Sequence, residues 1–163
     1  MKGFGEKNQS KKIKNLQNKQ KVNSEQFIQK AFQLQAQGKK LEAAKYYTHL
    51  IKTGVKDYRI FANYGIFLNE IGKTDLAIKF LKTASRNASS YAQVSPIISG
   101  ALKMNKPHLA VYAARRAARK GIYFISASYP KPAIYDTSQV EKALIYSIIR
   151  QESNFDPQAE SYK

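Results

Sequence analysis

Apolar residues recur along most of the chain at the three- and four-residue spacing that is typical of amphipathic helices. Between residues 24 and 120 these helical patterns come in pairs, and a glycine or an asparagine followed by lysine separates the two members of each pair. The first pair is the stretch SEQFIQKAFQLQAQGKKLEAAKYYTHLIKTG. Because glycine readily ends a helix in the left-handed conformation, the pattern predicts three helical hairpins with turns at Gly38, Gly72 and Asn105, and no sheet.

The hairpins repeat at a nearly constant spacing. At an offset of 34 residues Gly38-Lys39 recurs as Gly72-Lys73, and four further residues recur with it: Leu34 as Leu68, Ala43 as Ala77, Lys45 as Lys79, and Tyr46 as Phe80. A weaker third copy follows at an offset of 33, where Lys106, Leu109, Ala110 and Ala117 repeat Lys73, Leu76, Ala77 and Ala84. A constant period of this size indicates a repeat array, with Ala43 and Ala77 at close helix crossings.

Residues 24–90, and above all FANYGIFLNEIGKTDLAIKFLKTA, resemble the tetratricopeptide repeat, which carries glycine and alanine at these places. The resemblance implies an α-α superhelix over residues 23–120. Arrays of this kind bind many unrelated proteins, so the resemblance leaves open a function as a scaffold for a protein partner.

Helix-breaking residues follow the third hairpin at Gly121, Pro130 and Pro132. Residues 121–137 are therefore expected to form a connector, either a domain boundary or a packed loop, with aromatic side chains to bury: Tyr123, Phe124, Tyr129 and Tyr135. Ser138 and Glu141 then stand in capping-box spacing before a helix predicted to run to about Ser153. Asp156-Pro157 predicts the N-cap of a further helix.

Glu152 occupies an unusual position on the last predicted helix. On a helical wheel it falls within about 60° of Ile145, Ile148 and Ile149, which predicts a carboxyl group on the apolar face with a raised pKa. A raised pKa would suit a proton donor near neutral pH. The alternative is that Glu152, in the last turn, faces water or pairs with Arg116 or a lysine.

The stretch ALIYSIIRQESNFDPQAES resembles the opening of the catalytic domain of the soluble lytic murein transglycosylases. Upstream, NKPHLAVYAARRAARKGIYFISASYPKP resembles the helical superhelix of the same family, so the similarity covers about residues 76–161. It implies the first helix of a lysozyme-like domain, peptidoglycan as substrate, Glu152 as sole acid and base in forming a 1,6-anhydro product, and Ser153 in positioning Glu152 or substrate. Members of the family continue into a sugar groove, so we expect residues 138–163 to be a truncated start of that domain and the chain to be inactive.

The net charge of +17 in 18.5 kDa implies attraction to polyanions. Residues 1–22 are rich in lysine and poor in apolar residues, which predicts a basic disordered tail. A second basic cluster comprises Arg115, Arg116, Arg119 and Lys120, but no recognition motif surrounds it, so nucleic-acid binding ranks last among the interpretations. His49 and His108 stand apart from other metal-ligating residues and cysteine is absent, so no metal or cofactor is expected.

The first thirty residues contain no apolar run long enough for a signal peptide or a membrane span. The sequence as written therefore predicts a cytoplasmic chain without a membrane span, whereas the transglycosylase family that it resembles is periplasmic.

Overall fold

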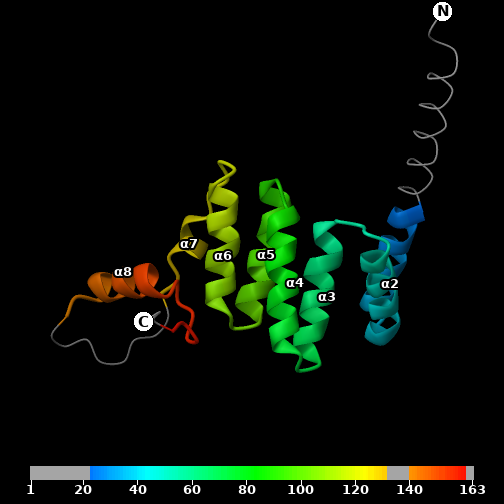
Figure 1. Ribbon diagram of the computed structural model, residues 1–163, viewed down its shortest axis with the longest axis horizontal. Coiled ribbons are helices and arrows are strands. Elements are labelled where there is room, and N and C mark those ends of the chain that lie inside the picture. The colour runs from blue at the N-terminus through cyan, green and yellow to red at the C-terminus, as the bar shows by residue number, and fades with distance from the viewer. Residues whose placement is uncertain (1–22, 132–139, 161–163) are drawn as a thin grey trace, which may run out of the picture. The chain divides into compact units, whose positions relative to one another are not determined.

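Every regular element in the described part of the chain is a helix, as the sequence predicts. The computed structural model describes residues 23–131 and 140–160, and no strand occurs within them. A first helix covers residues 23–36, and the others are α2 (Lys40–Lys52), α3 (Tyr58–Glu70), α4 (Thr74–Asn87), α5 (Tyr91–Lys103), α6 (Pro107–Ala118), α7 (Ile125–Ser128) and α8 (Lys142–Glu152) (Figure 1). The predicted tail 1–22, with Pro132, Tyr135 and Ser138, lies outside the described residues.

The chain divides into two compact units, one ending at Lys56 and the other beginning at Asp57. In the first unit, the helix over 23–36 and α2 form a hairpin with a buried apolar interior made by Ile28, Ala31, Leu34, Ala43, Tyr47 and Leu50. The Tyr47 hydroxyl donates a hydrogen bond of 2.6 Å to Gln35 Oε1 across the hairpin. Burial raises the pKa of Tyr47, so its hydroxyl stays protonated and remains a donor.

The three predicted turns are confirmed and share one geometry. Gly38 has φ +76°, its N–H donates to Gln35 O at 3.0 Å, and the next N–H, of Lys39, donates to Leu34 O at 2.9 Å. This pair of bonds is the Schellman motif, which satisfies two carbonyls that the helix end leaves without partners. The same pair of bonds closes α3 at Gly72 and α5 at Asn105, where φ is +78° and +53°.

In the second unit, α3 packs on α4, α5 packs on α6, and α4 also contacts α6. Alanines from α4 and α6 make up much of the core: Ala84, Ala110, Ala113, Ala114 and Ala117 are all buried. Ala77 is fully buried as well, as predicted for a close crossing. Since alanine adds little bulk, the helix backbones approach closely, and larger residues such as Leu81 and Ile97 fill the space that remains.

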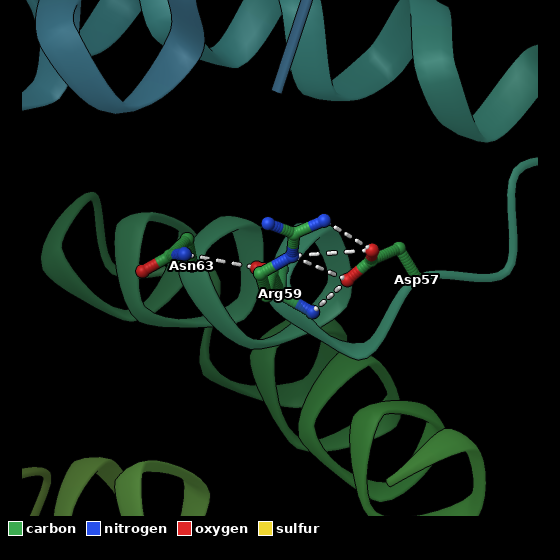
Figure 2. A network of polar contacts seen from close by, with 3 residues as sticks. All are labelled: Asp57, Arg59 and Asn63. Carbon is green, nitrogen blue, oxygen red and sulfur yellow. Dashed lines mark hydrogen bonds and ion pairs between the residues drawn. The ribbon is translucent and has the colours of Figure 1, made fainter. Parts of the chain in front are cut away.

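Asp57 caps the start of α3. Its carboxylate accepts a hydrogen bond of 2.8 Å from the Arg59 backbone N–H, and it forms an ion pair of 2.7 Å with the Arg59 guanidinium (Figure 2). Partial burial by itself would raise the pKa of Asp57. The hydrogen bonds and the charge of Arg59 outweigh this effect and hold the pKa below its ordinary value.

The connector after α6 buries less than the sequence predicts. Phe124 does stack on Tyr91, with ring centroids 4.4 Å apart, and the short helix α7 packs against α6. Tyr123 and Tyr129, by contrast, are 70% and 62% exposed, so the expectation that they would be buried is wrong. The residue of α7 that joins the core is Ala127, and the Tyr129 ring instead faces the Arg150 guanidinium.

Candidate functional site

The helix that carries Glu152 ends where the sequence predicts but begins later. α8 spans Lys142–Glu152 with Ser153 as its C-cap. Glu141 occupies the N-cap position, and its side chain forms no capping hydrogen bond. The predicted capping box required Ser138 at the N-cap and Glu141 three residues inside the helix, so that assignment is wrong. The backbone at Glu141 is extended, with ψ 129°, so Glu141 precedes the helix, and Ser138 lies outside the described residues.

Glu152 is exposed, which contradicts the prediction of a partly desolvated carboxyl group. Of the three isoleucines that the wheel places beside Glu152, Ile148, one turn before it, is exposed, whereas Ile145 and Ile149 are half-buried. Leu144 is 55% exposed and Ile148 52% exposed, and α8 contains no buried residue. The alternative in which the carboxylate faces water is the arrangement found. Periodicity placed the residue beside apolar neighbours but did not reveal that the end of this face at Glu152 is open to solvent.

The turn after α8 is anchored by Phe155, which is only 7% exposed. Asn154 and Phe155 both adopt the left-handed conformation, with φ 53° and 63°, so two consecutive non-glycine residues reverse the chain. Asp156 then accepts a hydrogen bond of 3.1 Å from the Gln158 N–H, as expected of a cap. Residues 157–158 form a turn, however, and no further helix follows within the described residues up to 160.

Ser153, the predicted substrate-binding residue, is half-buried. Its hydroxyl donates to Ile149 O at 3.0 Å, a common local bond at a helix end. Ser153 also lines two cavities, and Glu152 lines neither of them.

The larger cavity, of about 370 Å³, lies between the start of α6 and the turn after α8. It is lined mainly by apolar and small side chains: Asn105, Lys106, Pro107, His108, Ile149, Ser153, Phe155, Asp156 and Pro157. The smaller cavity, of about 150 Å³, is more polar and shares three of these residues. Its lining is Lys82, His108, Tyr112, Arg115, Ser153, Asn154 and Asp156.

Two guanidinium groups meet beside the smaller cavity. Arg115 of α6 and Arg150 of α8 both donate to the same side-chain oxygen, Asn154 Oδ1, at 2.8 and 2.5 Å. Arg150 also donates through Nε to Ser128 O at 2.8 Å and lies 5.6 Å from the centre of the Tyr129 ring. Partial burial lowers the pKa of Arg150, and the positive charge of Arg115 lowers it further.

His108, common to both cavities, is 8% exposed, and its Nδ1 atom has no hydrogen-bond partner among the described residues. Burial lowers its pKa. The charge of Asp156 opposes this effect, while the charges of Lys106 and Lys82 reinforce it. As predicted, the residue stands at a helix start, directly after Pro107, but it is not at the surface. His49 is exposed.

The basic cluster at the end of α6 does not act as one solvated face. Lys120 Nζ donates to Ala88 O at 2.5 Å and so binds a carbonyl at the end of α4. Arg115 is committed to Asn154, Arg116 is half-buried, and Arg119 is exposed. The four residues therefore do different things, and one of them helps to fix the turn after α8.

No group of three or more potential metal ligands lies together within the described residues. In the same part of the chain, none of the helices has the length and the hydropathy needed to cross a bilayer. The comparisons with known proteins assign no family: no protein-family model, no curated protein and no solved structure matches this chain.

Sequence reasoning missed the site that the geometry assembles around Asn154. In the sequence Arg115 belongs to a basic cluster, and no pattern connects it with Lys82, Tyr112, Arg150 or Asn154. Their separation along the chain explains this, because residues 82, 115 and 154 come from α4, α6 and the turn after α8. The one available signal was the SNFD segment itself, since asparagine favours the left-handed conformation of a tight turn.

Proposed function

We propose that this chain is related to the soluble lytic murein transglycosylases and carries their acid/base group on Glu152. The observation that supports this proposal most directly is the stripe on α8. Leu144, Ile148 and Glu152 follow one another at four-residue spacing, and all three are exposed. An exposed apolar stripe that ends in a carboxylate suits a helix that is completed by a further element. In this proposal, Glu152 acts as an acid only when such an element covers the stripe.

The proposed chemistry needs one carboxyl group. In its protonated form Glu152 donates to the glycosidic oxygen between N-acetylmuramic acid and N-acetylglucosamine as the C1–O bond breaks. The resulting carboxylate accepts the proton of the muramoyl C6 hydroxyl as O6 bonds to C1, which gives a 1,6-anhydro ring and restores the acid without water. Ser153 would position the substrate or Glu152 in such a site, and no metal or cofactor enters the reaction.

In the arrangement found here, we infer that the chain does not cleave glycan strands. General acid catalysis depends on holding the sugar oxygen within hydrogen-bond reach of the donor. Glu152 is exposed, and within the described residues it lines neither of the cavities that include its neighbour Ser153. We therefore propose that Glu152 needs a covering segment for activity. The proposed substrate is peptidoglycan, which lies in the periplasm.

The test compares four proteins on purified peptidoglycan, with 1,6-anhydromuropeptides measured by mass spectrometry. The chain and its Glu152→Gln variant are expected to release none. A chimera that continues after residue 161 with a transglycosylase groove segment should release them, and Glu152→Gln in that chimera should abolish release. Glu141→Gln, an exposed glutamate at the other end of α8, is the matched control and should leave the chimera active. A chimera indifferent to Glu152→Gln would remove Glu152 from the chemistry.

A second candidate function is a tetratricopeptide-type scaffold that binds a protein partner. Its support is the repeated turn: the bonds that close the helices at Gly38 and Gly72 are the same, 34 residues apart. Photo-crosslinking residues at Tyr123 and at exposed Lys79 would test it in the intact chain. One defined crosslinked protein, retained in Glu152→Gln, is expected of a scaffold. Identical crosslinks from both positions to abundant proteins would contradict selective binding.

A further inference from the structure

The cavity of about 150 Å³ in the second unit has more positive than negative side chains around it among the described residues. Lys82 and Arg115 line it, and Arg150 donates a hydrogen bond to Asn154, which is also part of the lining. Within the described residues, none of these three cations forms an ion pair with a carboxylate. Asp156 carries the one carboxylate of the cavity lining in that part of the chain, and it accepts the Gln158 N–H.

The two arginines are held close together at some electrostatic cost. Both point at one amide oxygen, and an amide oxygen carries only a partial negative charge. Arg150 also donates a hydrogen bond to Ser128 O and lies over the face of the Tyr129 ring. Like charges repel, so their convergence without a carboxylate between them favours an external anion that would bind to both.

The remaining donors suit such a ligand. A guanidinium carries five N–H donors, and within the described chain Arg115 uses one and Arg150 two. Lys82, whose ammonium lies 5.6 Å from the centre of the Tyr112 ring, offers a third cation, and the Tyr112 side chain lines the same cavity. His108, nine-tenths buried with an unpartnered Nδ1, completes the wall.

Size limits the ligand to a small group. A water molecule takes up about 30 Å³ in the liquid, so the cavity has room for a group of a few heavy atoms. A phosphoryl group meets this limit, carries up to two negative charges, and matches the planar fork of a guanidinium.

We propose that this cavity, between α4, α6 and the turn after α8, binds a phosphoryl oxyanion through Lys82, Arg115 and Arg150. Asn154 acts as a positioning residue, because its oxygen holds the two guanidinium groups at one place. The site is independent of the chemistry proposed for Glu152, which does not line the cavity.

The test uses the isotope-labelled full chain titrated with inorganic phosphate, with sodium chloride added to keep the ionic strength constant. The amide signals of residues 153–156 and the Nε–H signals of Arg115 and Arg150 should shift together and saturate. Lys82→Gln and Arg115→Gln should each raise the half-saturation concentration about tenfold or more, as expected for the loss of a charge-assisted bond. The hydrogen bonds to Asn154 among the described residues come from Arg115 and Arg150 and not from Lys82, so Lys82→Gln tests the site even where Arg115→Gln disturbs the turn.

Arg119→Gln is the matched control, since it removes the same charge from the same helix end at an exposed position. It should change the half-saturation concentration less than twofold. Equal effects of Arg115→Gln and Arg119→Gln, or shifts that rise without saturation at lysines throughout the chain, would show a diffuse attraction and overturn the proposal. Acetate in a parallel titration separates the two oxyanion classes: saturation at lower acetate than phosphate would assign the site to carboxylates and also overturn it.

Discussion

Gly65 of α3 lies against Ala77 of α4 so closely that a Cβ atom added to Gly65 would be 3.3 Å from the Ala77 carbonyl oxygen. The side chain of Leu81 lies at a similar distance, 3.2 Å from that added Cβ atom. The crossing of α3 and α4 therefore has no spare volume on either side. Ala77 is fully buried, which makes it the sensitive position of this crossing on α4.

We expect Ala77→Leu to lower the free energy of unfolding by about 1 to 3 kcal/mol, because the added atoms must displace a packed backbone. Lys79→Leu adds a leucine to the exposed face of the same helix and should change stability by less than about 0.5 kcal/mol. Urea denaturation of both variants checks this. An unchanged midpoint for Ala77→Leu would contradict the assigned register of the crossing.

The Asp57 and Arg59 pair predicts a dependence of stability on pH. The pKa of Asp57 is held below its unfolded value, so its contribution is present above about pH 4 and is lost as the pH falls through the folded pKa. Asp57→Ala should cost about 1 kcal/mol at neutral pH through the lost cap.

Asp57→Asn retains a capping oxygen and removes the charge, so its deficit should be smaller than that of Asp57→Ala and should shrink as the pH falls below about 4. Thermal unfolding between pH 3 and pH 7 measures both effects. A deficit of Asp57→Asn that stayed constant across this range would show that the carboxylate charge contributes nothing.

Asn105 ends α5 in the left-handed conformation, with φ 53°. Asn105→Ala should destabilise the chain by about 1 kcal/mol, since alanine has neither the freedom of glycine nor the polar side chain that eases this conformation. Asn105→Gly is the control, and it should be more stable than Asn105→Ala by about 1 kcal/mol. Equal stability of the two variants, measured by chemical denaturation, would argue that the turn relaxes to another geometry.

His108 should titrate below its ordinary value because burial disfavours its charged form. The unfolded chain then binds more protons than the folded chain below about pH 6.5, so stability is highest above this pH and falls as the solution is acidified. The imidazole NMR signals of His108 should give a midpoint below about 6.5. His108→Gln should remove this part of the slope, and a slope unchanged between pH 7 and pH 5 would contradict the assignment.

The last helix and the turn after it should respond differently to truncation. Ile148 is 52% exposed, so Ile148→Ala should change the free energy of unfolding by less than about 0.5 kcal/mol. Phe155 is 7% exposed, and Phe155→Ala should cost on the order of 3 kcal/mol. Denaturation of the two variants side by side measures the contrast. Comparable losses would show that the apolar stripe of α8 is covered in solution.

The local elements of this fold were predictable because their signals are local. Gly38 and Gly72 mark the two clearest turns, and the three-and-four spacing of apolar residues marks the helices on either side. The end of α8 near Ser153 was equally predictable. Its start was not, since the capping residues Ser138 and Glu141 have the right spacing but the backbone at Glu141 is extended.

The candidate site was not predictable to the same extent. A helical wheel gives the angle of Glu152 about the axis of α8, and it places Ile145, Ile148 and Ile149 near that side. Whether such a side is buried depends on what packs against it, and this is a property of other segments. Glu152 is consequently exposed, although its neighbours on the wheel are apolar.

The sequence by itself determined the helical class, the three hairpin turns and the alanine at the α3–α4 crossing, because each depends on residues within about one helical turn or on a simple repeat. Only the tertiary structure decided that Arg115 and Arg150 meet at Asn154 and that His108 is buried between two cavities. These relationships join residues up to 39 positions apart. Contacts at that separation are fixed by how α4, α6 and α8 pack, and no local pattern of polar and apolar residues encodes them.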